Sequence, residues 1–153
     1  MGPWTHLESV VSTEAVEAML ARDRAEWQAL VRVLEARPGH SLHDPESPTW
    51  NSRDVYAHLA RWMEQSTAHL EAALVCSSFA PVEGTDDEIN ARWQSEAQRL
   101  SLEETRSWAM RVFERRIEVI ESVKPTQWND RTFAIANADG AEHYAAHHRY
   151  IVV

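Results

Sequence analysis

The 153-residue chain has a single cysteine, Cys76. One thiol can form no disulfide within the chain and cannot supply a thiolate cluster for zinc. Basic residues are also scarce, because 15 Lys and Arg face 24 Asp and Glu, which gives a formal net charge of -9. Nucleic-acid binders carry a basic patch or stripe, and an acidic surface is repelled by anionic membranes. We therefore expect neither a nucleic acid nor a membrane as a partner.

Long hydrophobic runs are missing too, since every run falls well short of the roughly 20 apolar residues that span a bilayer. The segment from Met1 to Ser12 lacks the charged start and the apolar core of a signal peptide. His6 stands where the myristoylation pattern requires Ser or Thr. We expect a cytoplasmic protein. Its length suits one domain with a real core, over residues 1–153.

Tryptophan and histidine are plentiful, with seven Trp and eight His. Trp contributes a large buried area, and its N–H needs a hydrogen-bond partner. His is the commonest metal ligand and carries protons at neutral pH. The composition therefore suggests a bulky core and a polar internal site.

Helical spacing of apolar residues dominates the chain, and no segment shows the alternation of a strand. Capping residues and breakers then predict helices over about 13–36, 52–77, 86–99, 101–124 and 132–150. The third, short helix either stands alone or forms one kinked helix with the fourth. Residues Pro38 to Trp50 form a connection. Long helices with short connections predict an all-α antiparallel bundle, with room for one crossover.

The last of these helices has the weakest propensity. Gly140 costs about 1 kcal/mol relative to Ala in a helix interior. Asn137 and Asp139 are also poor interior formers, because their side chains compete for backbone hydrogen bonds. Either tertiary packing holds this helix, or it starts later than residue 132.

His143 and His147 are the sharpest local signal for chemistry. Residues at i and i+4 lie on one helix face, about 5–6 Å apart at Cβ, so both imidazoles can reach one metal ion. The pair lacks the Glu that follows the first His in zinc proteases, since Glu142 precedes it instead. For the pair alone, two surface histidines at this spacing by chance remain the simpler interpretation.

His58 changes that interpretation, because it shares the apolar face of its helix with Leu59 and Trp62. A histidine among core positions is more often hydrogen-bonded than a metal ligand. Here, however, another helix offers two histidines to the same bundle interior. Three neutral imidazoles with an open fourth position are typical of a catalytic zinc site, or of a nickel or iron site. We therefore expect His58, His143 and His147 to bind divalent Zn, Ni or Fe.

Four further residues are candidates for the surroundings of the metal. Gly140 lies one turn before His143, where a missing side chain leaves room for water or substrate or marks a close helix contact. Asn90 orients a histidine or a bound water, or simply belongs to a helix start. Trp62 and Trp93 line a pocket or pack in the core.

Glu142 and Asp54 are the candidate bases, placed only by their closeness in sequence to the histidines. His69 lies three helical turns after His58, on a nearly matching face. It is a candidate core residue and is too distant to bind the same metal.

Three short motifs, taken together and in this order, resemble the DinB-like family. WNSRDVYAHL at 50–59 resembles the W-(S/T)-x-x-D-x-x-x-H-L start of the second helix, with Asn51 in the Ser/Thr place. DDEINA at 86–91 resembles the D-x-x-N segment of the branch that includes the DfsB and ClbS proteins and, more distantly, mycothiol-dependent maleylpyruvate isomerase. HYAAH at 143–147 resembles the H-Y-x-x-H of the closing helix.

The resemblance implies a four-helix bundle with up-down-down-up connectivity, often a homodimer, with a metal site on His58, His143 and His147. It also implies metal-dependent chemistry on small molecules, frequently thiol transfer or detoxification with a low-molecular-weight thiol. The ClbS branch confers self-resistance by hydrolytic opening of a genotoxin's cyclopropane. Two departures concern the pocket. Asp139 stands where the family has Asn, and residues 140–142 (Gly-Ala-Glu) replace a bulkier Thr-Tyr-Glu.

Three functions are therefore open. The leading one is a metal-dependent enzyme acting on a small molecule, as a hydrolase or thiol transferase. The second is a non-enzymatic protein that binds or sequesters an apolar compound in a Trp-rich cavity. The third is a structural dimer module with a vestigial metal site.

Overall fold

The computed structural model describes residues 11–37 and 50–150, and all regular structure within them is helical. The elements are α1 (Thr13–Ala36), α2 (Ser52–Leu74), α3 (Asp86–Ala97), α4 (Leu102–Ser122), a 3₁₀ turn (Pro125–Gln127), α5 (Asp130–Asn137) and α6 (Ala141–Tyr150). The predicted all-α class is confirmed for these residues. Most of the predicted connection at 38–50 lies outside them. None of the described helices has the length and apolar character needed to cross a bilayer.

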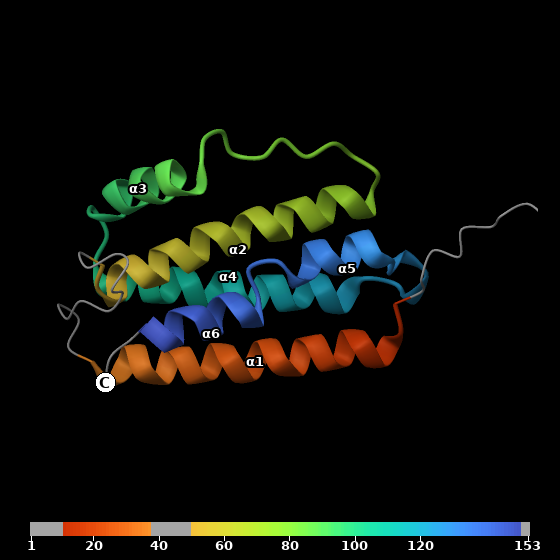
Figure 1. The fold of residues 1–153 in the computed structure, drawn as a ribbon, viewed down its shortest axis with the longest axis horizontal. Coiled ribbons are helices and arrows are strands. Elements are labelled where there is room, and N and C mark those ends of the chain that lie inside the picture. Colours follow the sequence, from red (N-terminus) through yellow and green to blue (C-terminus); the bar gives the residue numbers. More distant parts are fainter. Residues whose placement is uncertain (1–10, 38–49, 151–153) are drawn as a thin grey trace, which may run out of the picture.

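The long helices lie side by side as a bundle, in which α5 and α6 together take the place of one long helix (Figure 1). Helix α2 packs along α4, α6 along α1, and α5 against α2. Figure 1 shows α2 and α4 running in one direction, while α1, α5 and α6 run in the other. Side chains of α2 and α6 can therefore contribute to one site.

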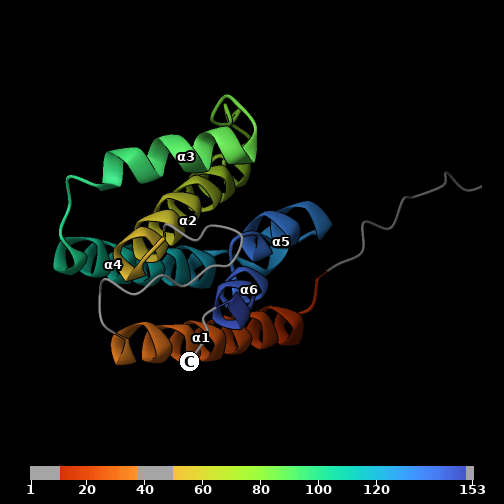
Figure 2. The ribbon, with the colours of Figure 1, turned by 60° about the vertical axis from the view of Figure 1, so that its left-hand side comes forward.

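Side-chain caps explain why the helices begin where the sequence predicts. Asn51 and Asp54 form a reciprocal capping box at the start of α2, with hydrogen bonds of 3.0 and 3.1 Å. Ser101 and Glu104 form another at the start of α4. Such caps each stabilise a helix by about 1 kcal/mol. The second box also separates α3 from α4, so α3 is an extra short helix rather than part of a kinked one. It covers the side of α2 that faces away from α1 (Figure 2).

The single helix predicted over 132–150 is wrong, because the chain breaks there into α5 and α6. Ala138 is extended with ψ of 140°, and Asp139 adopts the left-handed conformation with φ of 59°. Asp and Asn tolerate that conformation better than other side chains. The poor helix formers at 137–140 thus end one helix and start another instead of weakening a continuous one.

An aromatic cluster in the core fixes how α6 is rotated. Trp27 stacks on Phe113 with ring centroids 4.8 Å apart, and Tyr144 meets Trp27 edge-on at 5.2 Å. Tyr144 is fully buried, and its hydroxyl donates to the sulfur of Met63 over 3.1 Å. Because side chains one residue apart are about 100° apart around a helix, this anchor leaves the neighbouring residue, His143, free to face α2.

Candidate metal centre

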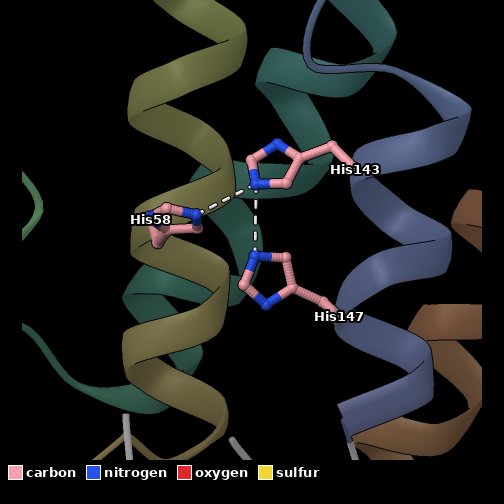
Figure 3. A group of neighbouring side chains, drawn as sticks. All are labelled: His58, His143 and His147. Atoms are coloured by element: carbon pink, nitrogen blue, oxygen red, sulfur yellow. Dashed lines mark hydrogen bonds between the residues drawn. The ribbon is translucent and has the colours of Figure 1, made fainter. Parts of the chain in front are cut away.

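Three histidine side chains converge between α2 and α6 (Figure 3). His58 comes from the second turn of α2, and His143 and His147 come from successive turns of α6. The Nε2 atom of His143 lies 3.0 Å from Nε2 of His58 and 3.1 Å from Nε2 of His147. One ligand atom from each ring lies within 4.8 Å of the other two. The sequence-predicted set is therefore brought together.

Two of the three separations between these nitrogens match those found across a shared metal ion. Nitrogen ligands lie about 2.0–2.1 Å from zinc, so two of them are about 2.9 Å apart at a right angle and about 3.4 Å apart at the tetrahedral angle. The observed separations of 3.0 and 3.1 Å fall within that range.

Hydrogen bonding alone does not satisfy the same three nitrogens. Each Nε2 carries either one hydrogen or one in-plane lone pair, so it makes a single hydrogen bond within the ring plane. His143 Nε2 nevertheless faces two ring nitrogens at hydrogen-bond distance. One of those contacts is left unsatisfied, whereas a cation among three lone pairs satisfies all three.

Burial keeps two of the rings neutral. Burial, and after it the neighbouring His143, lower the pKa of His147 to about 3. The pKa of His58 is also held well below its usual value, first by burial and then by His143 and His147, while Asn90 acts in the opposite direction. A neutral imidazole is the form that binds metal. These two rings are therefore ready to ligate at neutral pH without losing a proton.

The outer ring nitrogens of His58 and His143 also bear on a metal. Both Nδ1 atoms are buried without a hydrogen bond. A ligating histidine usually donates this second N–H to a carboxylate, carbonyl or water. Asp139 Oδ1 lies 3.4 Å from Nδ1 of His143, outside hydrogen-bond geometry but placed as such a partner. The sequence singled out Asp139 as a poor helix former and as a departure from a motif, and not as a partner of a ligand.

Trp50 forms a wall of the site that sequence reasoning missed. Its ring lies 4.8 Å from that of His58 and is stacked parallel to that of His147, with 6.4 Å between centroids. Only 7% of the residue is exposed. Its place at the head of the 50–59 motif was the available signal. Trp50 shields the two buried histidines from water on this side.

A buried ion pair holds the break between α5 and α6. Arg116 Nη1 donates to Asp23 Oδ2 over 2.7 Å, and Asp23 Oδ1 accepts from the backbone N–H of Ala141 over 2.8 Å. Arg116 also donates to the carbonyl of Ala136. The pair thus caps the end of α5 and the start of α6 at once. It fixes α6, and with it two of the three histidines.

Gly140 serves this ion pair and not the pocket to which its missing side chain was assigned. A Cβ at Gly140 would lie 2.6 Å from Arg116 Nη2 and 2.8 Å from Asp23 Oδ1. The space beside the glycine is therefore filled by the pair. The structure therefore contains the close helix contact, which was the alternative interpretation of Gly140 from the sequence.

The two candidate bases lie away from the histidine nitrogens. Asp54 uses Oδ2 in the cap of α2 and accepts from Gln98 through Oδ1, so both oxygens hold the helix start. Glu142 is exposed in the first turn of α6. Neither belongs to the group of ligand atoms around His143.

The predicted pocket residues of α2 and α3 lie together. Trp62 Nε1 donates to Asn90 Oδ1 over 2.7 Å, and the Trp62 ring meets Trp93 edge-on at 5.0 Å. Trp62 and Asp139 both line a cavity of about 410 Å³ between α2, the 79–84 segment, the start of α3 and α5. Trp93 and Asn90 lie behind Trp62. A second hollow of about 400 Å³, between α2 and α4, is lined by none of the histidines.

Comparison of the chain with protein-family models, with curated proteins and with solved structures gives no match.

Proposed function

We propose that this chain is a metal-dependent enzyme acting on a small molecule, with His58, His143 and His147 as the metal ligands. The observation that carries the proposal is the convergence of three Nε2 atoms, with contacts of 3.0 and 3.1 Å that hydrogen bonds among the rings cannot satisfy. Two of the rings are buried and neutral, as ligands must be.

The surrounding residues have separate tasks. Asp139 Oδ1, 3.4 Å from Nδ1 of His143, is the carboxylate placed to accept that hydrogen when the ring binds a metal, which would fix the ring and make its Nε2 a better donor of electrons. Trp50 keeps bulk water from His58 and His147. A divalent cation held here would supply Lewis acidity. It would lower the pKa of a bound water or thiol toward neutrality. The chemistry that fits is hydrolysis or thiol transfer.

The family resemblance points to the same chemistry. Helix directions in the bundle agree with the up-down-down-up order that a DinB-like chain would have. Segment 50–59 contributes Trp50 and the ligand His58, segment 86–91 contributes Asn90, and segment 143–147 contributes the other two ligands. We therefore favour detoxification or self-resistance among the possible roles.

Metal titration tests the proposal directly. Chelator-treated protein titrated with Co²⁺ should take up one equivalent and develop the visible absorption of a low-coordinate, nitrogen-bound ion. His147→Ala should lower the affinity by at least 100-fold. His148→Ala, which removes the adjacent histidine outside the ligand group, is the matched control and should leave the affinity unchanged. Equal weakening by both variants, or no binding by the parent protein, would refute a metal-dependent function.

A binding or sequestration protein is the second candidate, because a cavity lined in part by aromatic rings reaches Asp139, the neighbour of His143. Under this alternative, ligand binding should be unchanged by a chelator and no turnover should accompany it. Under the leading proposal, turnover requires the metal and disappears in His147→Ala.

A further inference from the structure

The 410 Å³ cavity has three aromatic rings in its wall, each held by a neighbouring side chain. We call it the α2–α5 cavity and define it by Trp62, His69, Phe79, Asp86 and Asp139. His69 of α2 stacks on Phe79, with centroids 4.6 Å apart and planes at 12°. On the same helix, Trp62 is fixed by its hydrogen bond to Asn90. Because these rings are already in place, a ligand does not lose binding energy to ordering them.

The charges that line the α2–α5 cavity are all negative. Asp86 and Asp139 are its acidic residues, and no Lys or Arg is among the residues that line it. The N-terminus of α3 also borders the cavity and favours anions, with a partial charge of about half a proton. Its first turn, however, carries the carboxylates of Asp86, Asp87 and Glu88. Three full negative charges exceed half a positive one, so the field favours cations.

Asp139 connects this cavity to the metal centre. It is a lining residue of the cavity, and its Oδ1 atom lies 3.4 Å from Nδ1 of His143. A molecule in the cavity is therefore separated from the ligand shell by one side chain.

We propose that the α2–α5 cavity binds a small organic cation, an amine carried on an apolar or aromatic body. The ammonium group is attracted by the carboxylates of Asp86 and Asp139 and by the faces of Trp62 and Phe79. The apolar body lies against the remaining wall. That this cation is a substrate rests on the proposed metal-dependent function, whereas its binding does not.

Three probes of one shape and different charge test the selectivity. They are 2-phenylethylamine, phenylacetamide and phenylacetate, each titrated by calorimetry at pH 7 into the full-length chain. The amine should bind about ten-fold more tightly than the neutral amide, because it adds both ring and carboxylate attraction. The carboxylate should bind weakest. Equal or tighter binding of the amide or the carboxylate would overturn the proposal.

Paired variants locate the binding. Asp86→Asn should weaken amine binding about three- to five-fold, as expected for an exposed charge. Phe79→Leu, which removes an aromatic face without a change of charge, should also weaken it. Asp87→Asn is the matched control, because it makes the same change of charge at the next residue, which does not line the cavity. If Asp87→Asn weakens binding as much as Asp86→Asn, overall charge explains the effect and the proposal fails.

The titration is repeated on chelator-treated and Zn²⁺-treated protein, so that failure here is distinguished from failure of the proposed function. Amine binding without any metal binding would support the cation site and refute the metal-dependent enzyme. Metal binding with no preference for the amine would support the metal-dependent enzyme and refute the cation site.

Discussion

Removal of the buried carboxylate at position 23 tests whether the break between α5 and α6 is held as the structure indicates. Asp23 and Arg116 are 0% and 2% exposed, and no solvent is available to replace their contact of 2.7 Å. Asp23→Ala leaves the guanidinium without a carboxylate partner, beside the neutral Ala136 carbonyl and Tyr144 hydroxyl, and removes the acceptor of the Ala141 N–H. Breaking a buried pair from one side costs about 3–5 kcal/mol. We expect the free energy of unfolding to fall by about 4 kcal/mol.

The double variant Asp23→Leu/Arg116→Met separates pairing from packing. It removes both charges and keeps apolar volume, and such replacements are often neutral or stabilising. We expect it to be more stable than Asp23→Ala by at least 2 kcal/mol, because no charge is left buried alone. Urea denaturation of the chelator-treated proteins measures both, with the slope required to stay constant.

Arg24→Ala is the control for a surface ion pair on the same helix. Arg24 pairs with Glu121, but their side chains are 47% and 50% exposed. An exposed pair contributes about 0–1 kcal/mol. Two results would refute the reasoning that the buried ion pair holds the break. One is a fall of less than 1 kcal/mol in the free energy of unfolding for Asp23→Ala, and the other is a double variant no more stable than that single variant.

Three further predictions follow from the same geometry. Gly140→Ala should destabilise the fold by about 2 kcal/mol or more in urea denaturation, because its Cβ would meet Arg116 and Asp23 at 2.6 and 2.8 Å. His147, with a pKa lowered from 6.5 to about 3, favours folding above pH 6.5, and this stability is lost as the pH falls toward 3. Metal-free protein should thus lose about 2 kcal/mol between pH 7 and 5, and His147→Asn should reduce that loss. The homodimer implied by the resemblance should give twice the monomer mass in light scattering, and a monomer at high concentration would contradict it.

Local sequence signals were enough to predict the helices. The starts of α1, α2 and α4 follow from caps within four residues and from apolar spacing along one face, neither of which needs a partner helix. The pairing of His143 and His147 could be predicted for the same reason, because both residues belong to one helix. Their meeting with His58 depends on how α6 is rotated against α2, which Tyr144 sets through contacts with distant helices.

The buried ion pair is a contact that local sequence signals do not predict. Asp23 stands in an apolar stripe between Leu20 and Trp27, and Arg116 shares a helix face with the buried Phe113 and Ile120, so each charge is visibly out of place. Their pairing links residues 93 positions apart, and nothing in either helix specifies the other. The prediction of one last helix failed for the same reason. Propensity shows that 137–140 is weak, but only the partners on α1 and α4 decide that the chain breaks there.

The break itself explains why a weak helical stretch suits this site. A continuous helix over 132–150 would follow one axis, whereas two helices let α5 pack on α2 and α6 pack on α1. Ala138 and Asp139, the residues of the break, line the α2–α5 cavity, and Asp139 also faces His143. These two residues thus line the cavity, and one of them places a carboxylate behind a proposed ligand. The buried ion pair of Asp23 and Arg116 compensates for the backbone hydrogen bonds that are lost where the helix is interrupted. Poor helix propensity at 137–140 is therefore a property of the site, and its stabilisation comes from outside the segment.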